Sequence, residues 1–362
     1  MTPPDRPAQQ PDSVGHLVHH LRWQADACRS LGSPFYADLL ARVADDVVAH
    51  GPAAAVLAGH ENDPGPSGLA LRLMGAVHRL VLERRAARLA VYFPSVGGTA
   101  DAAGAWPVLR DLLQAERAWL RGRLDQAPQT NEVGRAAALV GGLLHVADRW
   151  PGPLRLAEIG ASAGLNLRAD HYRVRFTSGP DGVGPPDSPV VLPDAWAGRR
   201  PPVEARLEVV ERLGCDLAPV DPTTTEGRLL LTSFVWPDQV DRLARLRGAL
   251  EVAARVPATV EQGSAGDFVS RLELADGATT VLWHSIMWQY LEPPERAAVT
   301  ERIGALGARA TADRRFAHLS LEPRRRTPSA PHEPLVVLRT WPGGEPRVLA
   351  TASPHGLPTT WE

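Results

Sequence analysis

Lysine is absent from this chain of 362 residues, so that all 39 of its basic side chains are arginines. Schiff-base chemistry and the anchoring of pyridoxal phosphate both need a lysine amine, and both are therefore excluded. A Walker-type phosphate loop also requires a lysine and is excluded for the same reason. The absence of one residue type thus removes several common kinds of enzyme.

Cysteine is almost as scarce, because Cys28 and Cys215 stand far apart and belong to no C-x-x-C pair. A structural zinc site or a disulfide framework is therefore not expected. His16, His19 and His20 lie close together in the sequence, but no acidic partner accompanies them. We interpret these histidines as a solvated helix face and predict no metal site.

The chain also lacks an excess of charge of one sign and any long apolar run. Its formal net charge is -2, which gives no electrostatic attraction toward nucleic acid or an anionic membrane. The first residues have no signal-peptide character, and no apolar run reaches the roughly 18 residues of a membrane span. With 44% hydrophobic residues, the composition is typical of a globular protein, and we expect a cytoplasmic location.

The first part of the chain has the periodicity of helices. A Pro-rich, polar tail at residues 1–13 is expected to be disordered. Residues 14–150 then carry apolar side chains at three- and four-residue spacing. We predict an all-helical N-terminal cap domain, with helices at residues 16–30, 33–50, 68–90, 106–123 and 131–149.

Residues 151–362 alternate between strand-like and helix-like segments, which predicts an α/β domain with a parallel sheet. A Gly/Pro-rich insertion interrupts it at about residues 178–202. We expect a mostly parallel, Rossmann-like sheet that ends in an antiparallel hairpin. Its candidate strands are 154–159, 207–210 or 229–235, 258–262, 280–284 and 316–321, with helices at 237–255 and 294–309 and the hairpin at 335–340 and 347–351.

The most informative segment is L-R-L-A-E-I-G-A-S-A-G-L-N-L, residues 154–167. It predicts a buried strand, a tight turn at Gly160, and a helix that Ser162 caps and that continues through Ala169. The small residues Ala161 to Gly164 leave room for the backbone to approach a ligand. The pattern E-x-G-x-x-x-G, which begins at Glu158, resembles motif I of the class I S-adenosylmethionine-dependent methyltransferases.

That resemblance implies a set of residues that hold the cofactor, S-adenosylmethionine. Asp267 would face the adenine amine with Phe268 beside the ring, although Asp267 equally fits a helix-capping role. The acid that binds the ribose hydroxyls would end the second strand, where Glu211, Asp216 and Asp238 compete. The remaining cofactor-binding residues implied by motif I are Glu158, Gly160, Ala161, Ser162, Gly164 and Asn166.

A cluster of polar and aromatic residues begins where the fourth strand should end, at the sheet edge that binds ligands in open α/β folds. His284 is the candidate general base, because its ordinary pKa lies near neutrality, and Tyr290 is the second candidate catalytic residue. Ser285, Trp288 and Gln289 would line the pocket for the methyl acceptor. The alternative for His284 is a histidine of the core.

Asn131, Glu132 and Arg135 stand at the predicted start of a helix in the N-terminal domain. Asn131 can cap this helix and Glu132 complements its dipole, which explains both residues structurally. Alternatively, the helix start covers the cofactor cleft, and Arg135 binds a carboxylate of the acceptor.

Together, these segments resemble an uncharacterised bacterial domain-of-unknown-function family with the same two-part layout. The resemblance is carried by 129–135, 158–167, 214–221, 236–238, 266–267, 284–290 and 355–356. The C-terminal half of this family resembles the class I methyltransferase fold, and this resemblance implies an S-adenosylmethionine-dependent methyltransferase that acts on a small molecule. Two alternatives stay open: a nucleotide-binding sensor or interaction protein without transfer activity, and a serine hydrolase in which G-A-S-A-G makes Ser162 the nucleophile.

Overall fold

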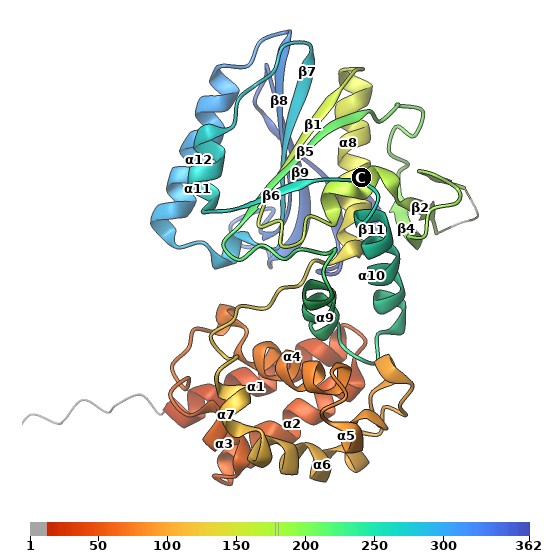
Figure 1. Cartoon of the computed structure of the whole chain (residues 1–362). Helices are drawn as coiled ribbons and strands as arrows, with labels where there is room; N and C mark the ends of the chain where they lie inside the picture. Colours follow the sequence, from red (N-terminus) through yellow and green to blue (C-terminus); the bar gives the residue numbers. More distant parts are fainter. Residues whose placement is uncertain (1–12, 178, 180) are drawn as a thin grey trace, which may run out of the picture. The chain divides into compact units, whose positions relative to one another are not determined.

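The computed structural model describes residues 13–177, 179 and 181–362, and Figure 1 shows its helices and strands. These residues divide into two compact units. The first unit runs to Pro128 and also includes Thr232–Leu243, and the second comprises Gln129–Leu231 and Ala244–Glu362. The predicted tail lies outside the described residues except for Ser13, which begins the first helix.

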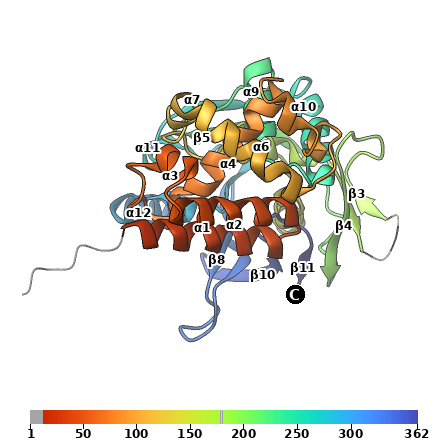
Figure 2. The same cartoon turned by 90° about the horizontal axis from the view of Figure 1, so that it is seen from below.

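The first unit is helical because its apolar residues recur every three or four positions and give each helix one apolar face. These faces meet in a single core that includes Leu39, Leu40 and Leu73, all fully buried. The helices α1 and α2 lie side by side (Figure 2). The helices of this unit are α1 (Ser13–Ser30), α2 (Pro34–Val48), α3 (Pro52–Leu57), α4 (Leu69–Leu82), α5 (Ala87–Ala90), α6 (Ala102–Ala115) and α7 (Arg117–Arg121).

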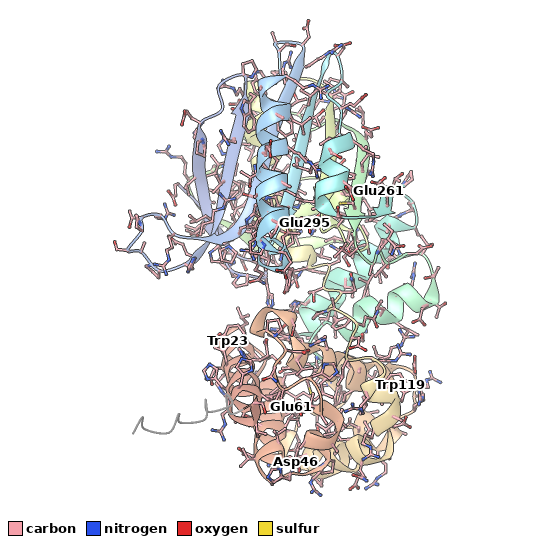
Figure 3. The ribbon with its side chains drawn as sticks, turned by 90° about the vertical axis from the view of Figure 1, so that its left-hand side faces the viewer. Trp23, Asp46, Glu61, Trp119, Glu261 and Glu295 are labelled. Atoms are coloured by element: carbon pink, nitrogen blue, oxygen red, sulfur yellow. The ribbon has the colours of Figure 1, made fainter. Side chains whose placement is uncertain are left out.

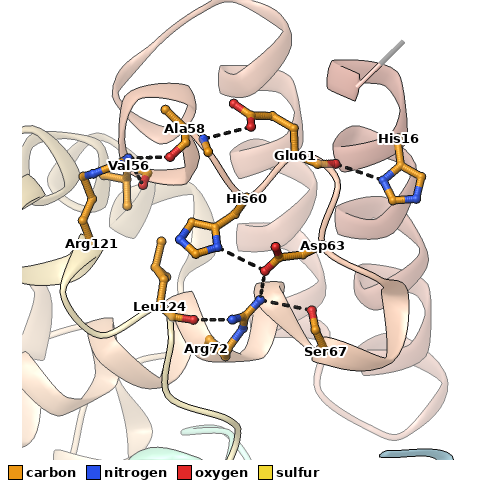
Figure 4. A network of polar contacts seen from close by, with 11 residues as sticks. His16, Val56, Ala58, His60, Glu61, Asp63, Ser67, Arg72, Arg121 and Leu124 are labelled. Carbon is orange, nitrogen blue, oxygen red and sulfur yellow. Dashed lines mark hydrogen bonds and ion pairs between the residues drawn. The ribbon is translucent and has the colours of Figure 1, made fainter. Parts of the chain in front are cut away.

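A polar network inside this unit ties α4 to the loop that precedes it (Figure 4). The buried Arg72 donates hydrogen bonds to Asp63, to the hydroxyl of Ser67 at 3.1 Å, and to the carbonyl of Leu124. The Nδ1 atom of His60 lies 3.1 Å from the Asp63 carboxylate. Burial raises the pKa of Asp63, but the hydrogen bonds from Arg72 and His60 outweigh it and lower the pKa. The network therefore favours the charged form of this partly exposed carboxylate.

The segment Thr232–Leu243 joins the helical unit although it lies far along the chain. Trp236 is 6% exposed and belongs to the helical core. Asp238 accepts hydrogen bonds from the hydroxyl of Ser33 at 2.6 Å and from the backbone N–H of Phe35 at 3.1 Å. The helical unit is therefore completed by residues from the second half of the sequence.

The second unit is built on one sheet, which has eleven strands in the described part of the chain. Their order is β3-β2-β4-β11-β10-β9-β8-β7-β1-β5-β6, and the five strands from β8 to β6 are all parallel. The strands are β1 (Leu154–Ile159), β2 (Arg173–Phe176), β3 (Gly182–Val183), β4 (Val191–Gly198), β5 (Val209–Asp216), β6 (Thr259–Gln262), β7 (Ala278–Ser285), β8 (Arg314–Arg324), β9 (Glu333–Trp341), β10 (Pro346–Ala352) and β11 (Thr359–Trp361).

Helices cover both faces of this sheet (Figure 1). On one face, α8 (Ala136–Arg149) packs closely because it presents Gly141 and Gly142 to the sheet. On the other face lie α11 (Ala265–Arg271) and α12 (Pro293–Ala308). Glu295 of α12 accepts a hydrogen bond from the backbone of α11 at 3.3 Å, so these two helices lie side by side (Figure 3). The remaining helices are α9 (Thr225–Ser233) and α10 (Val240–Ala253).

The helix expected after the glycine turn is not present, and this prediction was wrong. The chain forms instead a short 3-10 segment, η4 (Asn166–His171). Side chains take the carbonyls that an α-helix would use: Tyr172 donates to Leu165 O at 2.5 Å, and Arg168 donates to Gly164 O at 2.7 Å. Ser162 does not cap η4, which begins directly after Leu165.

Other expectations are confirmed or corrected by the strand assignments. The second strand is β5, and the alternative at 229–235 was wrong because helix α9 covers most of that range. The antiparallel pairing of β9 with β10 is as predicted, but β11, β4, β2 and β3 continue the sheet beyond it. The Gly/Pro-rich insertion contains β3 and β4.

The helix predicted at residues 68–90 is two helices, α4 and α5. Arg84 lies between them in a left-handed conformation, with φ of 61°, which an α-helix does not accommodate. None of the helices that the structure describes is long and apolar enough to cross a membrane.

Candidate functional site

The turn after β1 is tight, as Gly160 predicts, and its backbone is left-handed at three positions. Gly160, Ser162 and Gly164 all have positive φ angles, of 69°, 52° and 65°. A Cβ atom on Gly160 would lie 3.0 Å from the side chain of Met287, which follows β7. The glycine turn, residues 160–164, therefore lies at the carboxyl ends of the neighbouring strands β1 and β7.

Side chains from two other segments hold the amides of the glycine turn. The backbone N–H of Ser162 donates to Asp216 Oδ2 at 2.9 Å, at the end of β5. Asn131 Oδ1 accepts from Ala163 N at 3.2 Å and from Leu165 N at 2.8 Å. These amides face protein side chains, so they do not form a cradle for a phosphate.

The segment before α8 is fastened to the same edge of the sheet. Glu132 caps the 3-10 segment η3 (Val133–Arg135), and its carbonyl accepts a hydrogen bond from Asn166 Nδ2 at 3.3 Å. Arg135 donates to the carbonyl of Ser285 at 3.3 Å and to that of Pro354 at 3.0 Å. Asn131, Glu132 and Arg135 thus join the glycine turn to the end of β7, and each makes structural contacts there.

Glu158 is buried one residue before the end of β1. It is 2% exposed, and its Oε2 atom has no hydrogen-bond partner among the described residues. Burial raises the pKa of Glu158 to about 8, although the Trp283 side chain and the positive charge of Arg135 oppose this effect. Glu158 is therefore largely protonated at neutral pH and can donate a hydrogen bond.

His284 is fully buried on β7, and both of its ring nitrogens have partners. Its Nδ1 atom lies 2.8 Å from Glu322 Oε1, and its Nε2 atom lies 3.0 Å from Nε2 of His318. Its ring also stacks between those of Trp288 and His318, with centroids 5.1 Å apart in each pair. His284 cannot touch a substrate directly, but it can pass a proton between Glu322 and His318.

Glu322 and His318, both on β8, complete this chain of side chains. Glu322 is 2% exposed, and its Oε1 atom also accepts from the backbone N–H groups of Met287 at 3.1 Å and Trp288 at 3.3 Å. Burial, together with the charges of His284, Arg324 and Arg339, keeps the pKa of His318 well below its ordinary value. His318 is therefore neutral near pH 7 and can accept a proton.

The glycine turn and the histidine pair lie on opposite faces of the sheet. Glu158 pairs with Trp283, and Trp283 pairs with Leu319, so their side chains point to the same face of the sheet. That face carries α8, because Leu319 contacts Gly142 of this helix. His284 is the next residue along β7, so its side chain points to the face that carries α12. The two groups share the carboxyl edge of the sheet, where the loop after β7 contacts Gly160.

Four predicted site residues lie apart from these groups. Asp267 is exposed, and its carboxylate accepts from the hydroxyl of Ser264, the N-cap of α11, at 2.9 Å. Phe268 is 7% exposed and packs in the core under α11 and α12. Gln289 and Tyr290 are exposed on the short segment η5 (Trp288–Tyr290), and Tyr290 is 54% exposed.

His318 and Glu322 were not among the predicted site residues. A signal was present, because polar residues stand at every second position from His318 to Arg324, past the end of the strand expected at 316–321. Within the described ranges, no group of three or more histidine, cysteine or acidic side chains is arranged to hold a metal ion.

A helical unit followed by an α/β unit with a mixed sheet defines the class of this protein. The chain belongs to the family described as "Uncharacterized protein conserved in bacteria (DUF2332)", whose model matches residues 18–361. This confirms the expected membership of an uncharacterised bacterial family. No curated protein and no solved structure matches the chain.

Proposed function

We propose that this protein is an S-adenosylmethionine-dependent methyltransferase that acts on a small molecule. The observation that carries the proposal is the hydrogen bond of 2.9 Å between Ser162 N in the glycine turn and Asp216 Oδ2 at the end of β5. It joins the motif that packs against the cofactor with the acid that binds its ribose. Of the three acids considered for the ribose, Asp216 is the one that ends β5. Glu211 lies within that strand and pairs with Arg155 at 2.5 Å, and Asp238 belongs to the helical unit.

The order of the parallel strands supports the same proposal. Numbered by their order in the chain, β6, β5, β1, β7 and β8 read 3-2-1-4-5 across the sheet. This is the order of doubly wound nucleotide-binding sheets, whose ligands lie at the carboxyl ends of the strands where the order reverses. In this chain the reversal falls between β1 and β7, next to the glycine turn.

The residues at this edge fit the ribose end of the cofactor. Each oxygen of the Asp216 carboxylate accepts one backbone N–H, from Ser162 and from Ala218 at 2.9 Å, and keeps a lone pair for a ribose hydroxyl. The buried Glu158 retains an oxygen without a partner, as a hydrogen-bonding group of the site. When bound, S-adenosylmethionine supplies an activated methyl group, and the protein orients the acceptor and removes its proton.

The adenine end of the cofactor needs residues other than those first considered. Phe268 is buried in the core, and Asp267 already bonds to Ser264. We therefore restrict the cofactor-binding proposal to the glycine turn, Glu158 and Asp216.

Calorimetry of the full chain with S-adenosylhomocysteine tests the proposal. We expect binding that Asp216→Asn weakens at least tenfold, because it removes a charged acceptor of two ribose hydrogen bonds. Glu211→Gln, on the same strand, is the matched control and should bind like the wild type. A ligand at 100 times Kd should raise stability by roughly 2.7 kcal/mol. Failure of both S-adenosylmethionine and S-adenosylhomocysteine to bind would contradict the proposal, and binding without any methyl transfer would favour the sensor.

The hydrolase alternative rests on the positive φ of Ser162, a feature of strained nucleophile turns. However, the Ser162 hydroxyl donates to Gln129 Oε1 at 2.7 Å, and a carboxamide cannot act as a base. The amide hydrogen bonds of the turn to Asn131 and Asp216 also leave little for an oxyanion. These contacts favour the methyltransferase.

A further inference from the structure

A pocket of about 450 Å³ lies on the face of the sheet that carries α12, along β8 and β9. This volume suits a small ligand. Its walls are partly apolar, and its polar groups stand at alternate positions of β8. The residues on which the argument depends are Trp288, Ile303, His318, Glu322, Arg324 and Arg339.

The charges of this pocket favour an anion. Arg324 and Arg339 are half-buried on adjacent strands, and both lie near His318. Among the described residues, the Arg324 guanidinium donates only to Ser320 Oγ, at 3.1 Å, whereas Arg339 donates from Nε to Gly344 O and stacks on the Trp341 ring at 4.6 Å. The one carboxylate of the lining, that of Glu322, already binds His284. The lining therefore carries an excess of positive charge, and Arg324 is its arginine with donors left for an anion.

Glu322 and His318 each have a polar atom at this pocket that can bind a ligand. Glu322 Oε2 is buried and has no hydrogen-bond partner among the described residues. Within the same part of the chain, His318 bonds through Nε2 alone. Both residues contact His284 and form a proton relay with it. The pocket therefore combines an anion-binding group with groups that can move a proton.

The protons of the relay can be assigned from the contacts. Because a carboxylate only accepts, His284 donates from Nδ1 to Glu322 and, when neutral, accepts at Nε2. His318 must then donate from Nε2, which leaves a lone pair on its Nδ1 atom. Protonation at His318 Nδ1 can be shared with His284, whose cationic form the Glu322 carboxylate stabilises.

We propose that this pocket binds a hydroxylated aromatic carboxylate, whose carboxylate pairs with Arg324 and whose hydroxyl loses its proton to His318. The apolar walls at Trp288 and Ile303 accommodate the ring. When the hydroxyl ionises, its O–H bond breaks with the electron pair left on oxygen, and the proton ends on His318, which shares it with His284.

Calorimetry with 4-hydroxybenzoate, with its methyl ester as the neutral control, tests binding to the full chain without any cofactor. We expect the acid to bind at least ten times more tightly than the ester, and Arg324→Gln to weaken binding of the acid at least tenfold. Arg347→Gln, an exposed arginine on β10, should leave binding unchanged. Equal binding of acid and ester, or normal binding by Arg324→Gln, would overturn the proposal, as would tighter binding of inorganic phosphate.

Ultraviolet absorption of the phenolate tests the role of His318 separately. In the wild type, bound 4-hydroxybenzoate should ionise at a lower pH than the free probe. His318→Asn and Glu322→Gln should abolish this shift while retaining carboxylate binding. An unchanged shift in both variants would overturn the relay. Loss of carboxylate binding with normal S-adenosylhomocysteine binding refutes this inference alone, and the reverse result refutes the methyltransferase alone.

Discussion

At the scale of single residues, Glu158 links the site to the pH dependence of stability. Burial raises its pKa to about 8 from an ordinary value of 4.5. The folded state therefore holds this proton more tightly than the unfolded state does. The stabilisation is complete below about pH 4.5 and is lost as the pH rises to about 8, at up to about 1.4 kcal/mol per pH unit.

Glu158→Gln should therefore stabilise the protein at alkaline pH, because glutamine carries no charge to bury. We expect the melting temperature of the variant to exceed that of the wild type at pH 8 and to match it near pH 4.5. Glu208→Gln, at an exposed glutamate before β5, is the control. A Glu158→Gln effect of the same size at both pH values would show that burial of the charge is not the cause.

At the scale of secondary-structure elements, close approach of α8 to the sheet depends on two glycines. A Cβ atom on Gly141 would overlap the ring of Trp361 on β11, and one on Gly142 would overlap Leu319 on β8. Glycine in a helix costs about 1 kcal/mol relative to alanine, so its presence at two successive positions indicates a steric requirement.

Gly141→Ala and Gly304→Ala form a matched pair that tests this requirement. Gly304 lies on α12, is exposed, and has open space where a Cβ atom would stand. We expect Gly304→Ala to stabilise the protein by up to about 1 kcal/mol and Gly141→Ala to destabilise it by about 1–3 kcal/mol through overpacking. Denaturant unfolding measures both changes, and a stabilising Gly141→Ala would contradict the packing described for α8.

Most of the parallel strands and the β9–β10 hairpin could be predicted from the sequence, because their patterns are local. The 3-10 segment could not, since it depends on hydrogen bonds from Arg168 and Tyr172 to carbonyls of the turn. The relay was missed for a related reason. His284 contacts His318 because of the register in which β7 pairs with β8. The sequence of a single strand does not predict that register.

At the scale of the whole molecule, the helical unit is discontinuous in sequence. Trp236 contributes to its core from a segment that follows β5, and Asp238 of the same segment bonds to Ser33 and Phe35. A chain cut at residue 128 would therefore lack part of its own core and two hydrogen-bond acceptors. The predicted helix at 237–255 gave no indication of this role.

Trp236→Ala should destabilise the helical unit by about 3–5 kcal/mol, the usual cost of deleting a buried aromatic side chain. Hydrogen exchange of the α2 and α4 amides measures the loss locally. Trp23→Ala is the control, because Trp23 is 58% exposed. Normal protection of α2 and α4 in Trp236→Ala would contradict the assignment of this segment to the helical core.

The position of β11 has a consequence for synthesis of the chain. This strand, Thr359–Trp361, pairs with β10 on one side and with β4 on the other. It is the last of the described strands to leave the ribosome, yet it lies inside the sheet, where it joins β3-β2-β4 to all the other strands. Until it emerges, β4 and β10 both present open edges, which are prone to pair with other chains. The sheet can therefore close only after residue 361 has been translated, and both edges are exposed to mispairing until then.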